Sequence, residues 1–268
     1  MSTYDVVAPT YDEYRALSDD VVERIRSTII EASGPSSRPR LLDLGAGSGR
    51  IGRAFVAAGD DYVGVDLSLG MLRQFTRRAD TGGHPPRVVQ ADGQGLPFAD
   101  AVFDVVLLIQ VFGGLRGWRR VLAEARRVLR ARGALALGRS VMPADGVDAR
   151  MKERLAAILA EMGVAPDEKN AREDVHHWLE SAARGGASVV AATWDADRTP
   201  QGFLDRHRTG ARFSVLPEPV KDEALRTLRA WAVTSFGSLD AISSEQHVFE
   251  LRVFTFPERS IADAEPAR

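Results

Sequence analysis

The sequence contains no cysteine, which excludes disulfides, thiolate nucleophiles and cysteine-ligated zinc. Near its start it lacks the basic segment and apolar stretch of a secretory signal. The longest apolar stretch, 102–115, is interrupted by Asp104 and Gln110 and is too short to span a bilayer. We therefore expect a soluble, cytoplasmic protein that has no membrane partner and no metal site.

An excess of charge of one sign is also missing. The 35 basic and 37 acidic residues give a formal net charge of -2 at pH 7 and are spread along the whole length. No stretch forms the basic footprint of a dedicated nucleic-acid binder. We therefore expect no nucleic-acid partner, while the oligomeric state stays open.

The first half of the chain alternates short apolar runs with amphipathic segments. The apolar runs are predicted strands at 40–44, 61–66, 88–91, 103–109 and 134–137. The amphipathic segments are predicted helices at 50–58, 68–78 and 118–130. Strands and helices that alternate in this way indicate an α/β fold with a parallel sheet covered on both faces.

The second half is less regular. Further strands are expected at 188–194 and 247–256, the last of them antiparallel. Helices are expected at 19–32, 148–162, 173–184, 200–209 and 217–235. The polar tail 257–268 is expected to be disordered.

A glycine-rich turn, Asp43 to Arg50, follows the first predicted strand. Glycines between a strand and a helix let the backbone approach a ligand closely, beside the amide groups of a helix N-terminus. Residues 47–52 also fit the dinucleotide pattern G-x-G-x-x-G, and Asp66 lies 19 residues after Gly47, where such a site keeps its ribose-binding acid. The turn alone therefore leaves a nicotinamide-dependent oxidoreductase as an alternative.

Three features favour a different ligand. Asp43 directly precedes the glycines, where a carboxylate would be unfavourable beside a pyrophosphate but suits a cationic sulfonium amino acid. Read from Gly45, the place of the third dinucleotide glycine is taken by Arg50. A further acid, Asp92, ends the third strand, so that with Asp66 three successive strand ends bring carboxylates to one sheet edge.

Several segments resemble the class I S-adenosylmethionine-dependent methyltransferases, in the type 11 group that includes the ubiquinone- and menaquinone-biosynthesis enzymes. The matching segments are LLDLGAGSGRIG, VGVDLSLGML, VVQADGQGLPFADAVFDVVLLIQV and LAEARRVLRARGALAL, in the family's order across 40–137. The start, YDVVAPTYDEY, resembles the family's N-terminal tyrosine motif. The resemblance implies methyl transfer from S-adenosylmethionine to a small-molecule acceptor, at oxygen, nitrogen or carbon.

The resemblance also implies a Rossmann-like, doubly wound sheet of seven strands, mostly parallel with the last antiparallel, and a helical lid. We expect one domain over 1–256, with a core at about 33–140 completed by the last two strands. The lid is expected from about 1–32, 141–185 and 197–243.

The resemblance places a set of residues around the cofactor: Tyr4, Tyr11, Arg15, Asp43, Gly45, Ala46, Gly47, Asp66, Leu67, Met71, Asp92, Gly93 and Gln110. Asp43 is expected near the ammonium group, Asp66 at the ribose hydroxyls and Asp92 at the adenine amino group. Leu67 and Met71 would pack around the adenine, and Gln110 would lie between cofactor and acceptor. The three N-terminal residues would cap the methionine end.

The family pattern breaks after the fourth strand. Many relatives carry histidine or aromatic residues there, whereas this chain has VFGGL at 111–115. A catalytic residue is therefore not identified, and the candidates are His176, His207 and Tyr11. None is required, because in-line transfer from an activated sulfonium depends mainly on alignment.

Other interpretations stay open. An RNA or protein methyltransferase is disfavoured by the missing basic patch and by the absence of an N/D-P-P-Y motif. A nicotinamide oxidoreductase or a non-catalytic cofactor-binding relative remains an alternative. Gly49 and Gly52 are expected to serve either the cofactor or helix packing, and Asp104 a structural role.

Overall fold

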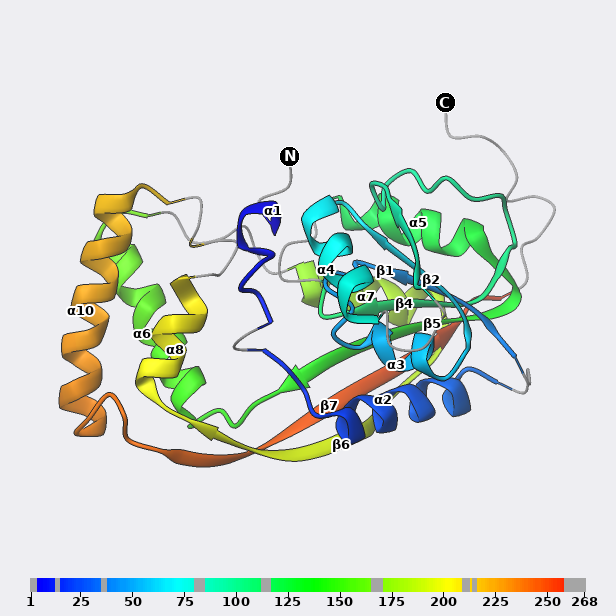
Figure 1. The fold of residues 1–268 in the computed structure, drawn as a ribbon. Helices are drawn as coiled ribbons and strands as arrows, with labels where there is room; N and C mark the ends of the chain where they lie inside the picture. Colours follow the sequence, from blue (N-terminus) through cyan, green and yellow to red (C-terminus); the bar gives the residue numbers. More distant parts are fainter. Residues whose placement is uncertain are drawn as a thin grey trace.

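A computed structural model describes residues 4–12, 15–34, 38–79, 85–111, 117–164, 171–208, 213 and 216–257 (Figure 1). Its strands are β1 (Arg40–Leu44), β2 (Asp61–Asp66), β3 (Arg87–Gln90), β4 (Phe103–Ile109), β5 (Leu129–Val141), β6 (Arg184–Arg198) and β7 (Ser243–Thr255). They form one sheet in the order β3-β2-β1-β4-β5-β7-β6. Strands β1 to β5 pair in parallel, while β7 is antiparallel to both of its neighbours. This confirms the predicted Rossmann-like sheet.

The helices are α1 (Tyr4–Val7), α2 (Asp19–Ala32), α3 (Gly52–Ala57), α4 (Leu69–Ala79), α5 (Trp118–Val128), α6 (Val147–Glu161), α7 (Ala171–Ala182), α8 (Pro200–Arg208) and α10 (Glu218–Phe236). Helices α2, α3 and α4 bury their apolar sides with one face of the sheet, and α5 and α7 with the other. Successive strand residues supply the two faces alternately: Leu41 and Leu107 belong to the first core, Leu42 and Leu108 to the second. Within the described ranges, no helix is long and apolar enough to cross a membrane.

Helices α6, α8 and α10 form a separate unit that we call the cap. They contact one another and share a third core, to which Met151, Phe203 and Leu228 contribute. The cap lies beyond the carboxyl end of β5, where the long antiparallel pair of β6 and β7 reaches it (Figure 1). The carboxyl edge of the sheet therefore faces the cap.

Two helices expected in the lid cover the sheet instead. Helix α2 buries Ile25 and Ile29 in the first core, and α7 buries Val175 and Leu179 in the second. Each pair has the i, i+4 spacing of one helix face, so the apolar stripes that predicted these helices are directed at the sheet. Strand β6 extends over 184–198, beyond the predicted 188–194, because its ends pair with β7 through polar residues that carry no clear strand pattern.

Candidate functional site

The glycine turn after β1 has a fixed backbone. Gly45 and Gly49 adopt φ values of 86° and 75°, which side chains disfavour. A Cβ on Gly45 would lie 2.4 Å from Cγ1 of Val111, and one on Gly49 would lie 2.1 Å from Cδ2 of Phe75. The amides of Gly45 and Ala46 both donate to the carbonyl oxygen of Val65, at 2.8 and 3.0 Å, which joins the turn to β2. The turn therefore cannot accept a side chain at either glycine without moving its neighbours.

Asp43 lies at the end of β1 with only 3% of its surface exposed. Its Oδ2 accepts a hydrogen bond from the Tyr62 hydroxyl at 2.6 Å, and Gly52 leaves room for that hydroxyl, since a Cβ there would lie 2.3 Å from it. Its Oδ1 is buried without a hydrogen-bond partner in the described part of the chain. Burial raises the pKa of Asp43 to about 7; the Tyr62 bond opposes this rise and the charge of Asp66 adds to it. A cation beside Oδ1 would satisfy this atom.

Asp66 ends β2 and is joined to the glycine turn. Its Oδ2 accepts from the Gly47 amide at 2.9 Å and its Oδ1 from the Ser68 amide at 2.8 Å. Burial raises its pKa, while these two backbone bonds act in the opposite direction. Met71 is buried and reaches the turn, with its Cε 3.6 Å from a Cβ built on Gly47. These predicted cofactor residues lie together, and the structure orients them through backbone amides.

Leu67, between Asp66 and Ser68, has 56% of its surface exposed. Its carbonyl oxygen accepts from the Gln90 side chain at 3.1 Å. An exposed leucine beside an acidic strand end offers an apolar surface to a flat ligand ring.

Asp92 and Gly93 follow β3 at the same sheet edge. The Ala91 amide donates to the Asp66 carbonyl oxygen at 3.2 Å, so the two strand ends lie next to each other. Asp92 is exposed, and its Oδ1 accepts from the Gln94 amide at 2.9 Å. A Cβ on Gly93 would be in ordinary contact with the side chain of Val121, at 3.6 Å.

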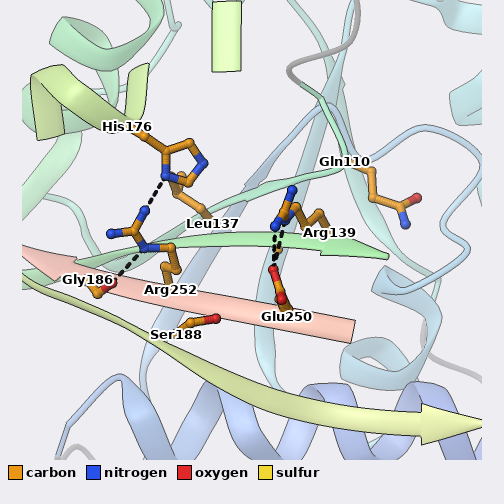
Figure 2. Close-up of a pocket in the computed structure, with 9 residues that line it drawn as sticks. Gln110, Leu137, Arg139, His176, Gly186, Ser188, Glu250 and Arg252 are labelled. Atoms are coloured by element: carbon orange, nitrogen blue, oxygen red, sulfur yellow. Dashed lines mark hydrogen bonds and ion pairs between the residues drawn. The ribbon is translucent and has the colours of Figure 1, made fainter. Parts of the chain in front are cut away.

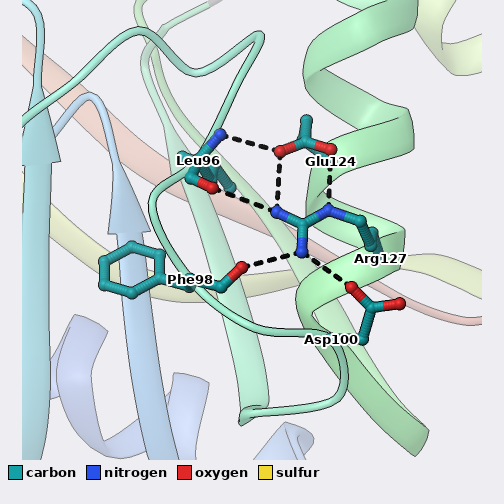
Figure 3. A network of polar contacts seen from close by, with 5 residues as sticks. All are labelled: Leu96, Phe98, Asp100, Glu124 and Arg127. Carbon is teal, nitrogen blue, oxygen red and sulfur yellow. Dashed lines mark hydrogen bonds and ion pairs between the residues drawn. The ribbon is translucent and has the colours of Figure 1, made fainter.

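The segment after Asp92 is held by Arg127 of α5 (Figure 3). The guanidinium donates to the carbonyl oxygens of Leu96 and Phe98, at 3.1 and 2.7 Å, and to both Asp100 and Glu124. Glu124 in turn accepts from the Leu96 amide at 2.7 Å, and its hydrogen bonds with Arg127 lower its pKa. The network fixes the loop that leads away from the β3 end of the edge.

The three N-terminal residues predicted to cover the methionine end of the cofactor lie together. The rings of Tyr4 and Tyr11 meet edge to face at 6.1 Å, and the Arg15 guanidinium lies 4.4 Å from the centre of the Tyr11 ring. Burial raises the pKa of Tyr4, and the charge of Asp66 adds to this rise. Arg15 also donates to the Arg206 carbonyl oxygen of α8 at 2.8 Å. The segment thus spans from the Asp66 side of the edge to the cap.

Two acids that the sequence did not single out fix this segment. Asp5 accepts from the Ser68 hydroxyl at 2.6 Å and the Gly70 amide at 3.0 Å. Asp12 is buried; it accepts from the Ser48 hydroxyl of the glycine turn at 2.7 Å and forms an ion pair with Arg78. The acidic character of the lead-in was visible in the sequence, but its partners lie at least 36 residues away along the chain.

Gln110, directly after β4, has the unusual φ of 58° for a residue other than glycine. Its amide donates to the Gly138 carbonyl oxygen at 2.8 Å and its side-chain Nε2 to the Ser140 hydroxyl at 2.6 Å. The next residue is Val111, which contacts Gly45 of the glycine turn. Gln110 therefore lies between that turn and the end of β5, and its place between cofactor and acceptor stays a prediction.

Gln110 also lines a cavity of about 290 Å³ over the carboxyl half of β5 and the adjoining parts of β7 and β6 (Figure 2). Arg139 pairs with Glu250 across β5 and β7, its Nε and Nη2 both within 2.9 Å of the same carboxylate oxygen. Arg252 donates to the Gly186 carbonyl oxygen, to Nδ1 of His176 and to Glu180. Most of the residues that line the cavity therefore have polar side chains.

The three catalytic candidates lie in different parts of the molecule. His176 is on α7 at the cavity, and Tyr11 is in the N-terminal segment against Arg15. His207 is on α8 in the cap, stacked on Phe203 at 3.7 Å, and burial lowers its pKa to about 4. Asp104 lies at the opposite, amino edge, where it accepts from the Arg40 amide and pairs with Arg130, a structural arrangement.

The sequence of this chain is similar to those of known methyltransferases. A family described as methyltransferase domain matches residues 42–137. The demethylmenaquinone methyltransferase of Thermobifida fusca (strain YX) is 30% identical over 199 residues, covering 71% of this chain and 84% of that protein. The chain belongs to the class I S-adenosylmethionine-dependent methyltransferases.

Other methyltransferases match shorter parts. The malonyl-[acyl-carrier protein] O-methyltransferase of Geobacter sulfurreducens is 36% identical over 159 residues, or 57% of this chain and 55% of that protein. For the first curated relatives the match spans only 55% to 59% of their own length. A solved methyltransferase structure from Anaeromyxobacter dehalogenans, described there as type II, has a TM-score of 0.59 and 18% identity, covering 88% of this chain and 97% of that one. That likeness shows the methyltransferase fold.

Proposed function

We propose that the chain binds S-adenosylmethionine along the carboxyl ends of β1, β2 and β3 and transfers a methyl group to a small-molecule acceptor. The observation that carries this proposal is the buried Oδ1 of Asp43, which has no hydrogen-bond partner in the described part of the chain. It lies beside a turn that excludes side chains at Gly45 and Gly49. A cationic amino acid group is the kind of ligand that this oxygen lacks.

The remaining donors and acceptors also fit this cofactor. Each oxygen of the Asp66 carboxylate accepts one backbone amide, which leaves lone pairs for two ribose hydroxyls. Leu67 and Met71 supply apolar surface next to it, and Asp92 a further acceptor at the adjoining strand end. The residues that would hold the cofactor are thus those that the family resemblance selects.

S-adenosylmethionine supplies, when bound, a methyl group that is already activated by the positive sulfur. The chain then has to orient the acceptor and exclude water, which accounts for much of the rate in such displacements. Tyr4, Tyr11 and Arg15 would cover the methionine end, and Gln110 would lie between the two ligands. A general base is not part of the proposal.

Three properties support a small acceptor or argue against the alternatives. The cavity at Gln110 has a volume of about 290 Å³, small for a ligand site. The sequence provides no basic footprint for RNA. A buried carboxylate in the position of Asp43 argues against the pyrophosphate of a nicotinamide cofactor. A cytoplasmic location is part of the same proposal.

Titration calorimetry with S-adenosylhomocysteine and, separately, with NAD⁺ tests the proposal. We expect micromolar or tighter binding of the first and none of the second. Incubation with methyl-tritiated S-adenosylmethionine and extracts of small metabolites should then give labelled product. Binding of NAD⁺ in place of S-adenosylhomocysteine would contradict the cofactor assignment, and binding without transfer to any fraction would contradict the enzymatic part.

A further inference from the structure

The cavity at Gln110 adjoins the proposed cofactor site. Gln110 lines the cavity, and its neighbour Val111 contacts Gly45 of the glycine turn. The cavity's other walls come from β5, β7, β6 and α7, all on the face of the sheet that α7 covers (Figure 2). A ligand in this space would lie next to a cofactor bound at the turn.

On the sheet face under the cavity, the side chains of β5 change from apolar to charged toward the carboxyl end of the strand, and those of β7 change with them. Toward the amino end of β5, Leu135 belongs to the buried core, as does Phe254 opposite it on β7. Toward the carboxyl end, Arg139 faces Glu250, and Arg252 follows two residues along β7. Paired residues on antiparallel strands share a face, so these three charged side chains form one patch. Charged groups on a helix-covered sheet face are unfavourable unless they are paired or bind a ligand.

Hydrogen-bond donors predominate in this patch. Arginine can only donate, so the bond between Arg252 and His176 makes Nδ1 of His176 the acceptor and places the proton of the neutral ring on Nε2. His176 therefore lacks a free basic nitrogen at Nδ1. Arg139 uses Nε and Nη2 for Glu250, and its Nη1 has no hydrogen bond to another described residue. Opposing these donors are the carboxylates of Glu250 and Glu180, each paired with one of the two arginines, and the side-chain oxygen of Gln110.

The guanidinium of Arg252 is oriented before any ligand arrives. It is held by the carbonyl oxygen of Gly186 at 2.6 Å and by Glu180 at 3.0 Å, together with His176. A group fixed in this way loses little freedom when it binds an anion. Leu137 is the one apolar side chain larger than a methyl group among the described residues that line the cavity.

We propose that this cavity binds the methyl acceptor and that the acceptor is a small, polar molecule with a carboxylate, held by Arg139 and Arg252. The inference rests on the proposed methyltransferase function and adds the chemical class of its substrate. Paired guanidinium and carboxylate groups have matched geometry and form charge-assisted hydrogen bonds. Acceptors in which the negative charge is masked, or that consist mainly of hydrocarbon, should bind poorly.

The test uses the full chain saturated with S-adenosylhomocysteine and matched probes: lactate, mandelate and anthranilate, each beside its methyl ester. Binding is measured by saturation-transfer NMR and calorimetry. We expect the acids to bind about tenfold more tightly than the esters, as for the loss of one charge-assisted hydrogen bond. Arg139→Gln should reduce this preference to about twofold while S-adenosylhomocysteine binds as before.

Arg130→Gln is the matched control. Arg130 lies on the same strand, is paired with Asp104, and its side chain is 48% exposed against 43% for Arg139, but it is at the opposite sheet edge. It should keep the preference for acids. If Arg139→Gln does not fold, the double variant R139Q/E250Q, which leaves neither charge without its partner, replaces it and should also lose the preference.

Equal binding of acids and esters, an acid preference that survives in R139Q or the double variant, or no binding of any acid at millimolar concentration would overturn the inference. In each case unchanged binding of S-adenosylhomocysteine shows that the cofactor site is intact. Failure of S-adenosylhomocysteine itself to bind would instead overturn the proposed function on which the inference rests.

Discussion

The cofactor edge, formed by the glycine turn and the ends of β1 to β3, and the cap, formed by α6, α8 and α10, are built by different means. At the edge, carboxylates meet backbone amides of neighbouring turns, as Asp66 does with Gly47 and Ser68. These partners come from short segments whose positions follow from strand order. At the base of the cap, ion pairs join side chains of elements far apart in the sequence.

The contacts at the base of the cap connect α6 with α8, β6 and β7. Asp148 at the start of α6 forms an ion pair with Arg206 of α8 and lies 3.7 Å from Arg198 of β6. On β7, Glu245 accepts from the Val147 amide at 2.7 Å, and His247 lies beside it with its pKa lowered by burial. Because of this difference, we expect substitutions of cap side chains to leave the backbone of the cofactor edge unchanged. The four predictions that follow probe this separation.

The largest effect is expected at the edge from Gly49→Ala. The new methyl group would lie 2.1 Å from Phe75, in a backbone conformation with φ of 75°. Together these should lower the free energy of unfolding by about 3 kcal/mol and weaken S-adenosylhomocysteine binding. Urea unfolding followed by circular dichroism measures the stability.

Gly59→Ala is the control for that change. Its φ is 73°, but nothing lies within 4 Å of the added Cβ. Only the backbone preference is lost, which costs about 1 kcal/mol. Equal losses in the two variants would show that the contact with Phe75 does not constrain the turn.

In the cap, Asp148→Asn should lower stability by a similar amount without affecting the cofactor edge. The Asp148 and Arg206 side chains are only 9% and 14% exposed, and removing one partner of a buried pair costs about 3 kcal/mol. We expect S-adenosylhomocysteine affinity within about twofold of the unchanged chain. Glu161→Gln, on the same helix in the more exposed pair with Arg154, should cost less than about 1 kcal/mol. A large loss of cofactor affinity in Asp148→Asn would show that the cap and the cofactor edge are not independent.

A smaller effect is expected from pH, through Asp43. Its pKa is raised from 3.8 to about 7, so the folded chain without ligand binds a proton that the unfolded chain has released between these values. Its contribution to stability is therefore fully present below the unfolded pKa and is lost as the pH rises through about 7. The pH dependence of cation binding has the opposite sign, because a cation binds the deprotonated carboxylate of Asp43.

Affinity for S-adenosylhomocysteine should thus rise by up to about tenfold per pH unit below pH 7 and level off above it. Calorimetry from pH 5.5 to 8, in buffers of different ionisation enthalpy, should also detect proton release on binding. Asp43→Asn removes the titrating group and should flatten both profiles. A pH dependence that persists in Asp43→Asn would assign the titration to another group.

The contrast between the two regions also explains what could be predicted from sequence. Strand ends and the glycine turn are local features, so Asp43, Gly47 and Asp66 could be placed at one edge before the structure was known. The bond from Tyr62 to Asp43 and that from Ser48 to Asp12 depend on side-chain packing between distant segments, which hydrophobic periodicity does not report.

The same reason limited the prediction of the cap and its surroundings. The apolar stripes of α2 and α7 predicted helices but did not say which surface they cover, and both cover the sheet. The charged patch of Arg139, Glu250 and Arg252 requires the register of β5 with β7, which single-sequence patterns do not fix. The two arginines proposed to bind the acceptor were therefore found only from the structure.

Calorimetric titration of S-adenosylhomocysteine into Asp66→Ala and Asp61→Ala tests the central claim most directly. The two acids lie at opposite ends of β2, and Asp61 is paired with Arg40 and Arg87 at the amino edge. If Asp66 holds the ribose, its loss removes two charge-assisted hydrogen bonds and should weaken binding about a hundredfold, with binding to Asp61→Ala changed less than about threefold. Unchanged affinity in a folded Asp66→Ala variant would contradict the placement of the cofactor at this edge.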